Sequence, residues 1–139
     1  MKKFLKKILV GCLVTVSVLF GVACKKETKV VSELKESTSA RVVIYVVETE
    51  GEPKLIDCME QLKKDGTFSY TIEGGMVTQM NGKANGEGYW MLYTSDSEMG
   101  NDQWGTTEYN GETLESAILG ADALVVEENE LYVWVYQIF

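Results

Sequence analysis

The chain opens with a basic segment followed by a hydrophobic one. Residues 1–7 read MKKFLKK, and residues 8–22 are uncharged and apolar except for Thr15 and Ser17. A basic start, a short apolar run and a small residue before a polar stretch are typical of a secretory signal peptide. The apolar run is also shorter than the ~20 residues that a membrane-spanning helix usually needs. We therefore expect residues 1–23 to be a signal peptide.

Further along, the pattern predicts a strand and then a helix. Residues 41–48 (RVVIYVVE) are β-branched or aromatic almost throughout, which is typical of a strand buried on both faces. Apolar residues then recur with the helical spacing i, i+3, i+4 and i+7, at Leu55, Cys58, Met59 and Leu62. Gly66 stands where a helix C-cap is expected.

Alternating apolar and polar residues predict more strands after this helix. The segments are residues 68–73, 76–80, 89–94, 106–109, 112–115 and 131–139. Asn110-Gly111, between two of them, is the strongest short signal for a β-hairpin. Together the segments predict an α+β fold, with a mixed sheet of about five strands packed on one short helix.

The polar residues before the first predicted strand suggest a linker. Residues 27–39 are mostly polar and end in Ser37-Thr38-Ser39. This composition favours a flexible tether, and a frayed helix is the alternative. We expect a tether over residues 24–39 and a single domain over residues 40–139.

The hydrophobic segment ends in Gly21-Val22-Ala23-Cys24, which resembles the lipobox of bacterial lipoproteins. The last three positions match the motif, and Gly21 stands where the family has Leu. Leu9-Val10-Gly11-Cys12 matches better locally, but too little apolar sequence separates it from Lys7. The resemblance implies that Cys24 carries lipid and holds the exported chain on the outer face of the cytoplasmic membrane. An uncleaved membrane anchor, with Cys24 incidental, is the alternative.

Several motifs of the predicted domain follow one another in a recognisable order. GYWMLY at 88–93 is the most specific, and Asn81-Gly82 before it and LYVWVY at 131–136 support it. Their order resembles that of the transcobalamin-like C-terminal domain family, found in exported bacterial proteins and in animal cobalamin carriers. Glu128-Asn129-Glu130 replaces the family's Asp-Gly-Asp-like turn, and Asn tolerates a left-handed turn conformation.

This resemblance implies a β-grasp-like fold and makes cobalamin a candidate ligand. In the carriers the domain covers one face of the bound cobalamin, and a large helical domain supplies the rest of the site. The sequence holds no counterpart of that helical domain, so the resemblance implies only part of the carriers' binding apparatus.

The composition argues against catalysis. The chain contains no histidine, which excludes His-based acid–base chemistry, His-containing triads and His-ligated metals. Cys58 lies on the predicted apolar helix face, where a core thiol is the expected role and a nucleophile the alternative. No calcium-loop or phosphate-loop motif is present. We expect no enzyme, no metal site and no required cofactor.

Charge excludes one class of partner. The formal net charge is −8, and removal of residues 1–23, with four lysines and no acid, lowers it to −12. A surface of this sign repels nucleic acid. A solvated exported domain is the interpretation that we favour.

Aromatic side chains are the candidate binding residues. On the strand 89–94, Trp90 shares one face with Leu92, whereas Tyr89 and Tyr93 occupy the other. If the helix covers the Trp90 face, Tyr89 and Tyr93 would lie on the open face beside aromatics of the last strand. Such a platform suits a flat ligand, and aromatic pairing that only stabilises the sheet is the alternative. The full candidate set is Tyr89, Trp90, Tyr93, Trp104, Tyr132, Trp134 and Tyr136.

Trp104 differs from the others because it falls in the polar segment 95–105, which we expect to be a loop. A tryptophan in such a loop either packs back on the domain or is presented as a binding anchor. The sequence leaves both alternatives open.

These observations predict a membrane-tethered, extracytoplasmic lipoprotein that binds a ligand without catalysis. The ligand would be cobalamin, another corrinoid or another flat molecule, handed to a transporter or a surface protein. The alternative is a structural or adhesive module that contacts another protein through a sheet edge or an aromatic loop.

Overall fold

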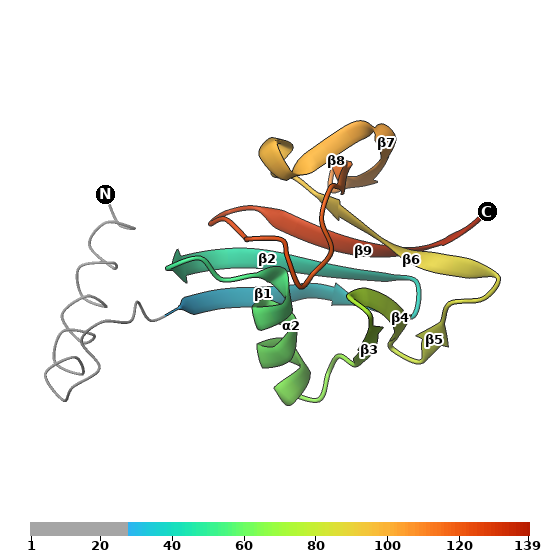
Figure 1. Cartoon of the computed structure of the whole chain (residues 1–139), viewed down its shortest axis with the longest axis horizontal. Helices are drawn as coiled ribbons and strands as arrows, with labels where there is room; N and C mark the ends of the chain where they lie inside the picture. Colours follow the sequence, from blue (N-terminus) through green and yellow to red (C-terminus); the bar gives the residue numbers. More distant parts are fainter. Residues whose placement is uncertain (1–27) are drawn as a thin grey trace, which may run out of the picture.

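A computed structural model describes residues 28–139, which form a large antiparallel sheet with a small sheet and one α-helix packed against it (Figure 1). The large sheet has six strands in the order β1-β2-β9-β6-β8-β7. In that order their bounds are Lys29–Ser37, Arg41–Glu50, Leu131–Ile138, Gly88–Thr94, Glu112–Ala117 and Gly100–Tyr109.

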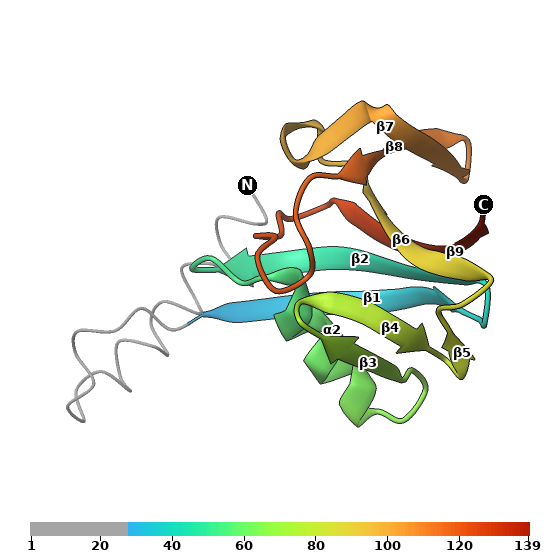
Figure 2. The same cartoon turned by 45° about the vertical axis from the view of Figure 1, so that its right-hand side comes forward.

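The α-helix and the small sheet lie at the opposite end of the molecule from β7 and β8, as Figures 1 and 2 both show. The helix is α2, Leu55–Lys64, and the small sheet has the order β3-β4-β5. Its strands are Tyr70–Glu73, Met76–Met80 and Lys83–Ala84, and a 3₁₀ turn, η1, covers Ser97–Met99.

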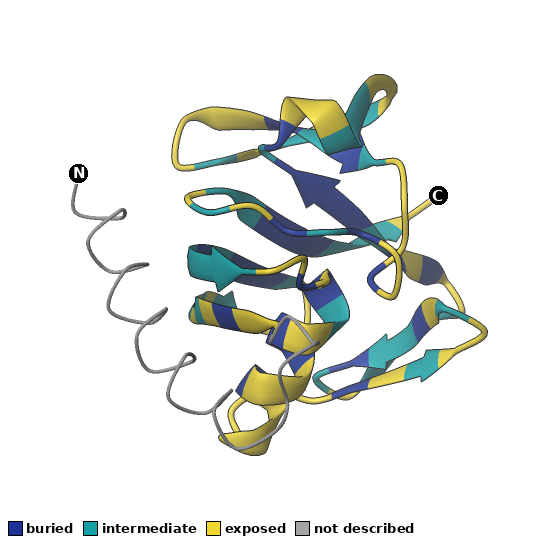
Figure 3. Ribbon diagram, turned by 60° about the vertical axis from the view of Figure 1, so that its left-hand side comes forward, coloured by how far each residue is buried: buried dark blue, intermediate teal, exposed yellow. Residues whose placement is uncertain are grey.

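The central strands bury both faces, and this divides the core into two clusters. Along β2, Val42, Ile44 and Val46 belong to the larger cluster, which includes the apolar side of α2. Val43 points the other way, into a smaller cluster with Tyr93, Leu114 and Val133. The expectation of a strand buried on both faces over residues 41–48 is therefore confirmed, and Figure 3 shows buried residues concentrated in the central strands.

Helix α2 forms where its apolar spacing predicts. Leu55, Cys58, Met59 and Leu62 are its buried residues, and the opposite side is exposed (Figure 3). The Asp57 carboxylate accepts a hydrogen bond from the Lys54 backbone N–H at 2.8 Å, at the start of the helix. Gly66 has φ 78°, the left-handed conformation expected just after a helix C-terminus.

The predicted turns are also present. Asn110 and Gly111 have φ 52° and 80°, which is the two-residue geometry that joins β7 to β8. Asn129 has φ 67°, so an asparagine supplies the left-handed residue of the turn before β9.

The expectation of a tether over residues 24–39 is wrong for Lys29–Ser37, which forms β1 at the edge of the large sheet. Polar side chains suit this strand because it is an edge strand with one face toward solvent. Val30 is the one buried residue of the strand, whereas Val31 next to it is 52% exposed. The domain thus begins about ten residues before residue 40, the start that apolar content alone had predicted.

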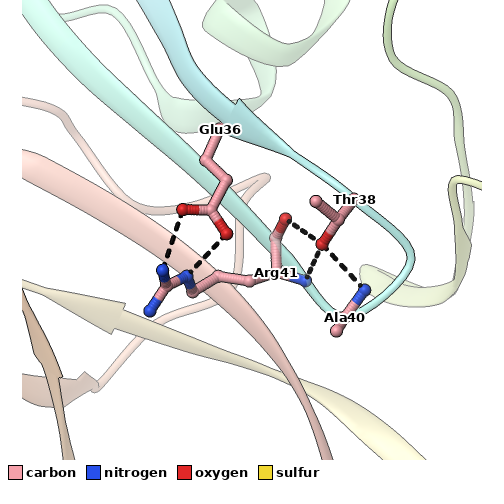
Figure 4. Close-up of polar contacts among 4 residues, drawn as sticks. All are labelled: Glu36, Thr38, Ala40 and Arg41. Atoms are coloured by element: carbon pink, nitrogen blue, oxygen red, sulfur yellow. Dashed lines mark hydrogen bonds and ion pairs between the residues drawn. The ribbon is translucent and has the colours of Figure 1, made fainter.

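Thr38, Ser39 and Ala40 form the turn between β1 and β2, and Ser37 is the last residue of β1. Thr38 Oγ1 accepts hydrogen bonds from the backbone N–H groups of Ala40 and Arg41, at 3.1 and 2.9 Å (Figure 4). The Arg41 guanidinium donates to both Glu36 carboxylate oxygens, at 3.0 and 2.8 Å. These local contacts close the hairpin that the sequence pattern conceals.

Two further details of the predicted fold need correction. The sheet is not mixed, because every strand pair of the described residues is antiparallel, and the large sheet has six strands rather than about five. The α+β class itself is compatible with the architecture. The predicted signal peptide, 1–23, and Cys24 lie outside the described residues. Within residues 28–139 no helix is long and apolar enough to cross a membrane.

The neighbours Val30 and Val31 test whether β1 belongs to the fold. We expect Val30→Thr to lower the free energy of unfolding by about 1–3 kcal/mol, because it buries a hydroxyl in the core. Val31→Thr, on the exposed side of the same strand, should change it by about 0.5 kcal/mol or less. Urea unfolding of both variants beside the parent chain measures the difference. Equal, negligible effects would mean that this segment is a tether after all.

Candidate functional site

The candidate aromatic residues do not form one open platform. Leu92 pairs with Trp134 and Trp90 with Tyr136 across β6 and β9, and residues directly opposite one another share a face. The β9 aromatics therefore lie on the Trp90 face, packed in the larger core, while Tyr93 is buried in the smaller core on the other face. The predicted grouping of Tyr89 and Tyr93 with the β9 aromatics is wrong for this reason.

Two candidates remain exposed, and they lie apart from this core. Tyr89 is 48% exposed on β6 and contacts Phe139, with ring centroids 6.2 Å apart. Trp104 is 63% exposed and lies in β7, not in a loop covering all of 95–105. It falls in the irregularity between Asn101 and Thr106, where the pairing with β8 is interrupted. Of the two alternatives for Trp104, presentation to solvent is the one observed.

The buried tryptophans line a cleft of about 310 Å³ beside the helix-side core. Three large hydrophobic residues of the lining are exposed, namely Met76, Ile118 and Leu119. The complete lining is Gly75, Met76, Val77, Trp90, Met91, Leu92, Ser116, Ala117, Ile118, Leu119, Gly120 and Trp134. None of these side chains is charged.

Two chain segments form the walls of this cleft. One is the β3–β4 turn, where Gly75 has φ 83°. The other is the loop after β8, and a Cβ added at Gly120 would lie 3.1 Å from the Gly75 carbonyl oxygen. The loop is held from behind, because Leu124 is fully buried and its carbonyl accepts the Leu55 backbone N–H at 2.8 Å. The first turn of α2 thereby fixes one wall of the cleft.

The cleft's two indole N–H groups differ in their hydrogen bonding. Trp90 Nε1 donates to the Lys83 carbonyl at 2.8 Å, and Tyr136 packs edge-on against the Trp90 ring with centroids 5.5 Å apart. Trp134 is only 5% exposed, and its Nε1 has no acceptor among the described residues. Such a group is rare in a folded protein, because a buried donor without a partner costs free energy.

Sequence reasoning identified Trp90 and Trp134 but missed the other half of the lining. The wall from Ala117 to Gly120 is part of the segment AILGADAL, whose apolar residues fall in no predicted strand or helix. Hydrophobic side chains in a predicted loop, followed by Gly120, were the available signal.

Burial shifts the pKa of several titratable groups of the described residues. Cys58 is buried on α2, and this burial raises the pKa of its thiol to about 11. Burial also raises the pKa of Tyr93, whose hydroxyl donates to the Gln137 side chain. Residues 28–139 contain no group of three or more Cys, Asp or Glu side chains placed to hold a metal ion.

Comparison with known proteins gives this cleft no precedent. No protein-family model, no curated protein and no solved structure matches the chain.

The raised thiol pKa predicts that Cys58 reacts slowly. Because a thiol with a pKa of about 11 holds roughly 100-fold less thiolate at pH 8 than one near 9.0, alkylation by iodoacetamide should be at least about 100-fold slower in the folded chain. Peptide mapping by mass spectrometry follows Cys58 separately from the other cysteines. Urea should restore the normal rate, whereas fast labelling of the folded chain would mean an accessible, reactive thiol.

Proposed function

We propose that this domain is a non-catalytic ligand-binding module and that a small, flat, apolar ligand binds in the Trp90–Trp134 cleft. The observation that carries the proposal is an uncharged cleft of about 310 Å³ with two tryptophans in its lining. This volume lies at the lower end of the range of about 300–1,000 Å³ found for small-molecule pockets. Aromatic walls favour flat ligands because ring faces and edges pack closely against them.

The apolar residues around the cleft support this function. Met76, Ile118 and Leu119 leave hydrophobic surface in water. Burial of apolar surface is favourable by about 25 cal/mol for each Å² removed from water. They converge from the β3–β4 hairpin and the loop after β8 on one cleft. A ligand that covers them would recover part of this free energy on binding.

Cobalamin remains a proposed ligand, on the strength of the transcobalamin-like motifs. The β-grasp-like description belongs to the same proposal, and what supports it is a curled sheet packed beside a single α-helix. The fully antiparallel pairing departs from the mixed sheet that we expected. A corrinoid is much larger than the cleft, so an edge or a side group of it would enter.

The proposed cellular setting is the outer face of the cytoplasmic membrane, with the domain held by lipid on Cys24. The lipobox-like residues Val22-Ala23-Cys24 and the basic, apolar start of the chain support this setting. Two or more acyl chains are needed for lasting attachment, since one alone binds a membrane only marginally. A tethered binder would deliver its ligand to a neighbouring transporter or surface protein.

One observation favours the second candidate function, an adhesive or structural module. Trp104 is exposed on β7, which is an edge strand of the large sheet among the described residues. Edge strands pair readily with an added strand, and tryptophans are frequent anchors at protein interfaces.

Ligand binding predicts a specific pattern of NMR shifts. We expect naphthalene, added to the ¹⁵N-labelled full chain in detergent micelles, to shift the indole signals of Trp90 and Trp134 but not that of Trp104, because only the first two line the cleft. Trp→Phe variants assign the three signals, and cobalamin is titrated in parallel.

Leu119→Glu should weaken naphthalene binding about tenfold or more, because it places a charge in the apolar wall. Val31→Glu adds the same charge at an exposed residue outside the cleft and is the matched control. If no probe moves the Trp90 or Trp134 signal, the domain does not bind ligands in this cleft. Shifts confined to Trp104 would favour the adhesive function.

Lipidation is tested by mass. When the protein is produced in bacterial cells, its intact mass should include diacylglycerol on Cys24. Cys24→Ser should abolish both the added mass and the partition of the protein into detergent. Cys12→Ser is the control and should leave both unchanged. An unmodified native protein, or lipid lost only with Cys12→Ser, would contradict the assignment to Cys24.

A further inference from the structure

The large sheet curls so far that its two edges approach each other on the side that faces away from α2. The Arg41 guanidinium of β2 lies 5.2 Å from the centre of the Tyr109 ring of β7, although three strands separate β2 from β7 in the sheet order. Figure 2 shows the β7–β8 hairpin turning back over the rest of the sheet in this way. The curl creates a second hollow in the molecule.

This hollow, the Tyr45–Tyr109 groove, has a volume of about 270 Å³. Its lining comes from β1, β2, the β7–β8 hairpin and the start of β9 with the turn before it. It shares no lining residue with the Trp90–Trp134 cleft. A ligand of the groove would therefore be bound separately from a ligand of the cleft.

Two tyrosine rings give the groove aromatic surface, and a cation stacks on each ring. Lys35 Nζ lies 5.6 Å from the centre of the Tyr45 ring, and Arg41 occupies the corresponding place at Tyr109. Both rings are half-buried, and Leu131 adds an aliphatic side chain packed on the smaller core cluster. Such rings attract the C–H groups of a ligand, because the face of an aromatic ring carries partial negative charge.

Three polar side chains of the lining have unused capacity for hydrogen bonds. Asn129 Oδ1 accepts a hydrogen bond from the Tyr45 hydroxyl at 2.9 Å, and its amide N–H groups have no acceptor within residues 28–139. The Asn110 amide and the Glu112 carboxylate have no hydrogen-bond or ion-pair partner in that range either. Asn110 and Asn129 have φ 52° and 67°, so both side chains project from defined turns.

We propose that the Tyr45–Tyr109 groove binds a neutral sugar ring, namely a single pyranose unit. A pyranose presents C–H groups on its faces and hydroxyls around its edge, and each hydroxyl both donates and accepts hydrogen bonds. This combination matches aromatic surface bordered by amide and carboxylate groups. The inference goes beyond the proposed function, because it concerns another site and another class of ligand.

Charge argues against other classes of ligand. Lys35 and Glu112 carry opposite charges, so the lining has no net charge that would select an ion. An anion would also meet the repulsion of a chain with a net charge of −8. A wholly apolar ligand would cover the two asparagine amides without giving them partners, which costs free energy.

The volume of the groove fits one ring. An apolar protein cavity of about 150 Å³ accommodates one benzene molecule, which is a bare six-membered ring. The groove, at about 270 Å³, is large enough for one six-membered ring together with its hydroxyls, and too small for two such rings. A longer glycan would therefore place a single unit in the groove.

Sugar binding is tested with methyl glucoside, methyl galactoside and methyl N-acetylglucosaminide. Each is added to the ¹⁵N-labelled full chain in dodecylphosphocholine micelles, because this detergent has no sugar headgroup. We expect at least one of them to shift the amide signals of Asn110 and Asn129 and to leave the indole signals of Trp90 and Trp134 unchanged. Sorbitol at the same concentration, with hydroxyls like those of glucose but no ring, should shift none of these signals.

Two variants place the sugar in the groove, and the Asn129 amide signal reports their affinity. Asn110→Gly removes one amide and keeps a residue that accepts a positive φ. It should weaken binding of the glycoside about fivefold, the size of one neutral hydrogen bond. Glu112→Gln should weaken binding at least as much, because hydrogen bonds to a charged group are stronger. Glu73→Gln, at an exposed residue of β3 outside the groove, is the matched control and should leave the affinity unchanged.

The results decide this inference separately from the proposed function. It is refuted if none of the three glycosides shifts the Asn110 or Asn129 signal, or if sorbitol shifts them equally. Equal affinities of Glu112→Gln, Asn110→Gly and the parent chain would also refute it, since the sugar would then bind elsewhere. Naphthalene and the indole signals of Trp90 and Trp134 decide the proposed function, so either can fail while the other holds.

Discussion

The pairing of β9 between β2 and β6 is the interaction on which the other features depend. Trp134 of β9 is paired with Val42 of β2 on one side and with Leu92 of β6 on the other. One face of these three strands therefore presents a continuous apolar surface. The opposite side gains Val43, Val133 and Tyr93 by the same register. A slip of one residue would exchange these two sets and move every aromatic of β9 away from the helix. The register thus determines both the core and the cleft.

The cleft exists because the large sheet is longer than the elements that cover it. Helix α2 covers the first strands, and the small sheet continues the cover toward Trp90, where Val77 and Met80 are buried. Between the small sheet and the loop after β8 the covering is incomplete, and Trp90 and Trp134 reach the cleft there. The start of α2 holds the loop after β8 through a backbone hydrogen bond, and this loop approaches the β3–β4 turn closely at Gly120 and Gly75.

Local signals in the sequence predicted the local structure well. The helix over Leu55–Lys64 follows from its four apolar residues, and the turns at Asn110-Gly111 and Asn129 follow from residues that accept a positive φ. Periodicity also separated the two faces of β6 correctly, with Trp90 and Leu92 in the larger cluster and Tyr93 in the smaller one. In these segments the nearest neighbours along the chain decide the conformation.

Features that depend on partners far along the chain were not predictable in the same way. Strand β1 buries only Val30, so its apolar pattern is too weak to reveal a strand that backbone pairing with β2 creates. The face shared by Trp90, Trp134 and Tyr136 depends on strand register, which no single segment encodes. The cleft itself joins residues from β4, β6, β9 and the loop after β8, so it becomes evident only once these segments are assembled.

The early start of β1 has a mechanical consequence for a chain attached at Cys24. Only residues 25–28 would separate the lipid from the first residue of β1, and four residues reach at most about 14 Å. So short a connection would hold the domain close to the membrane surface and restrict its tumbling. Any neighbour that receives the ligand would then have to present its entrance at that height.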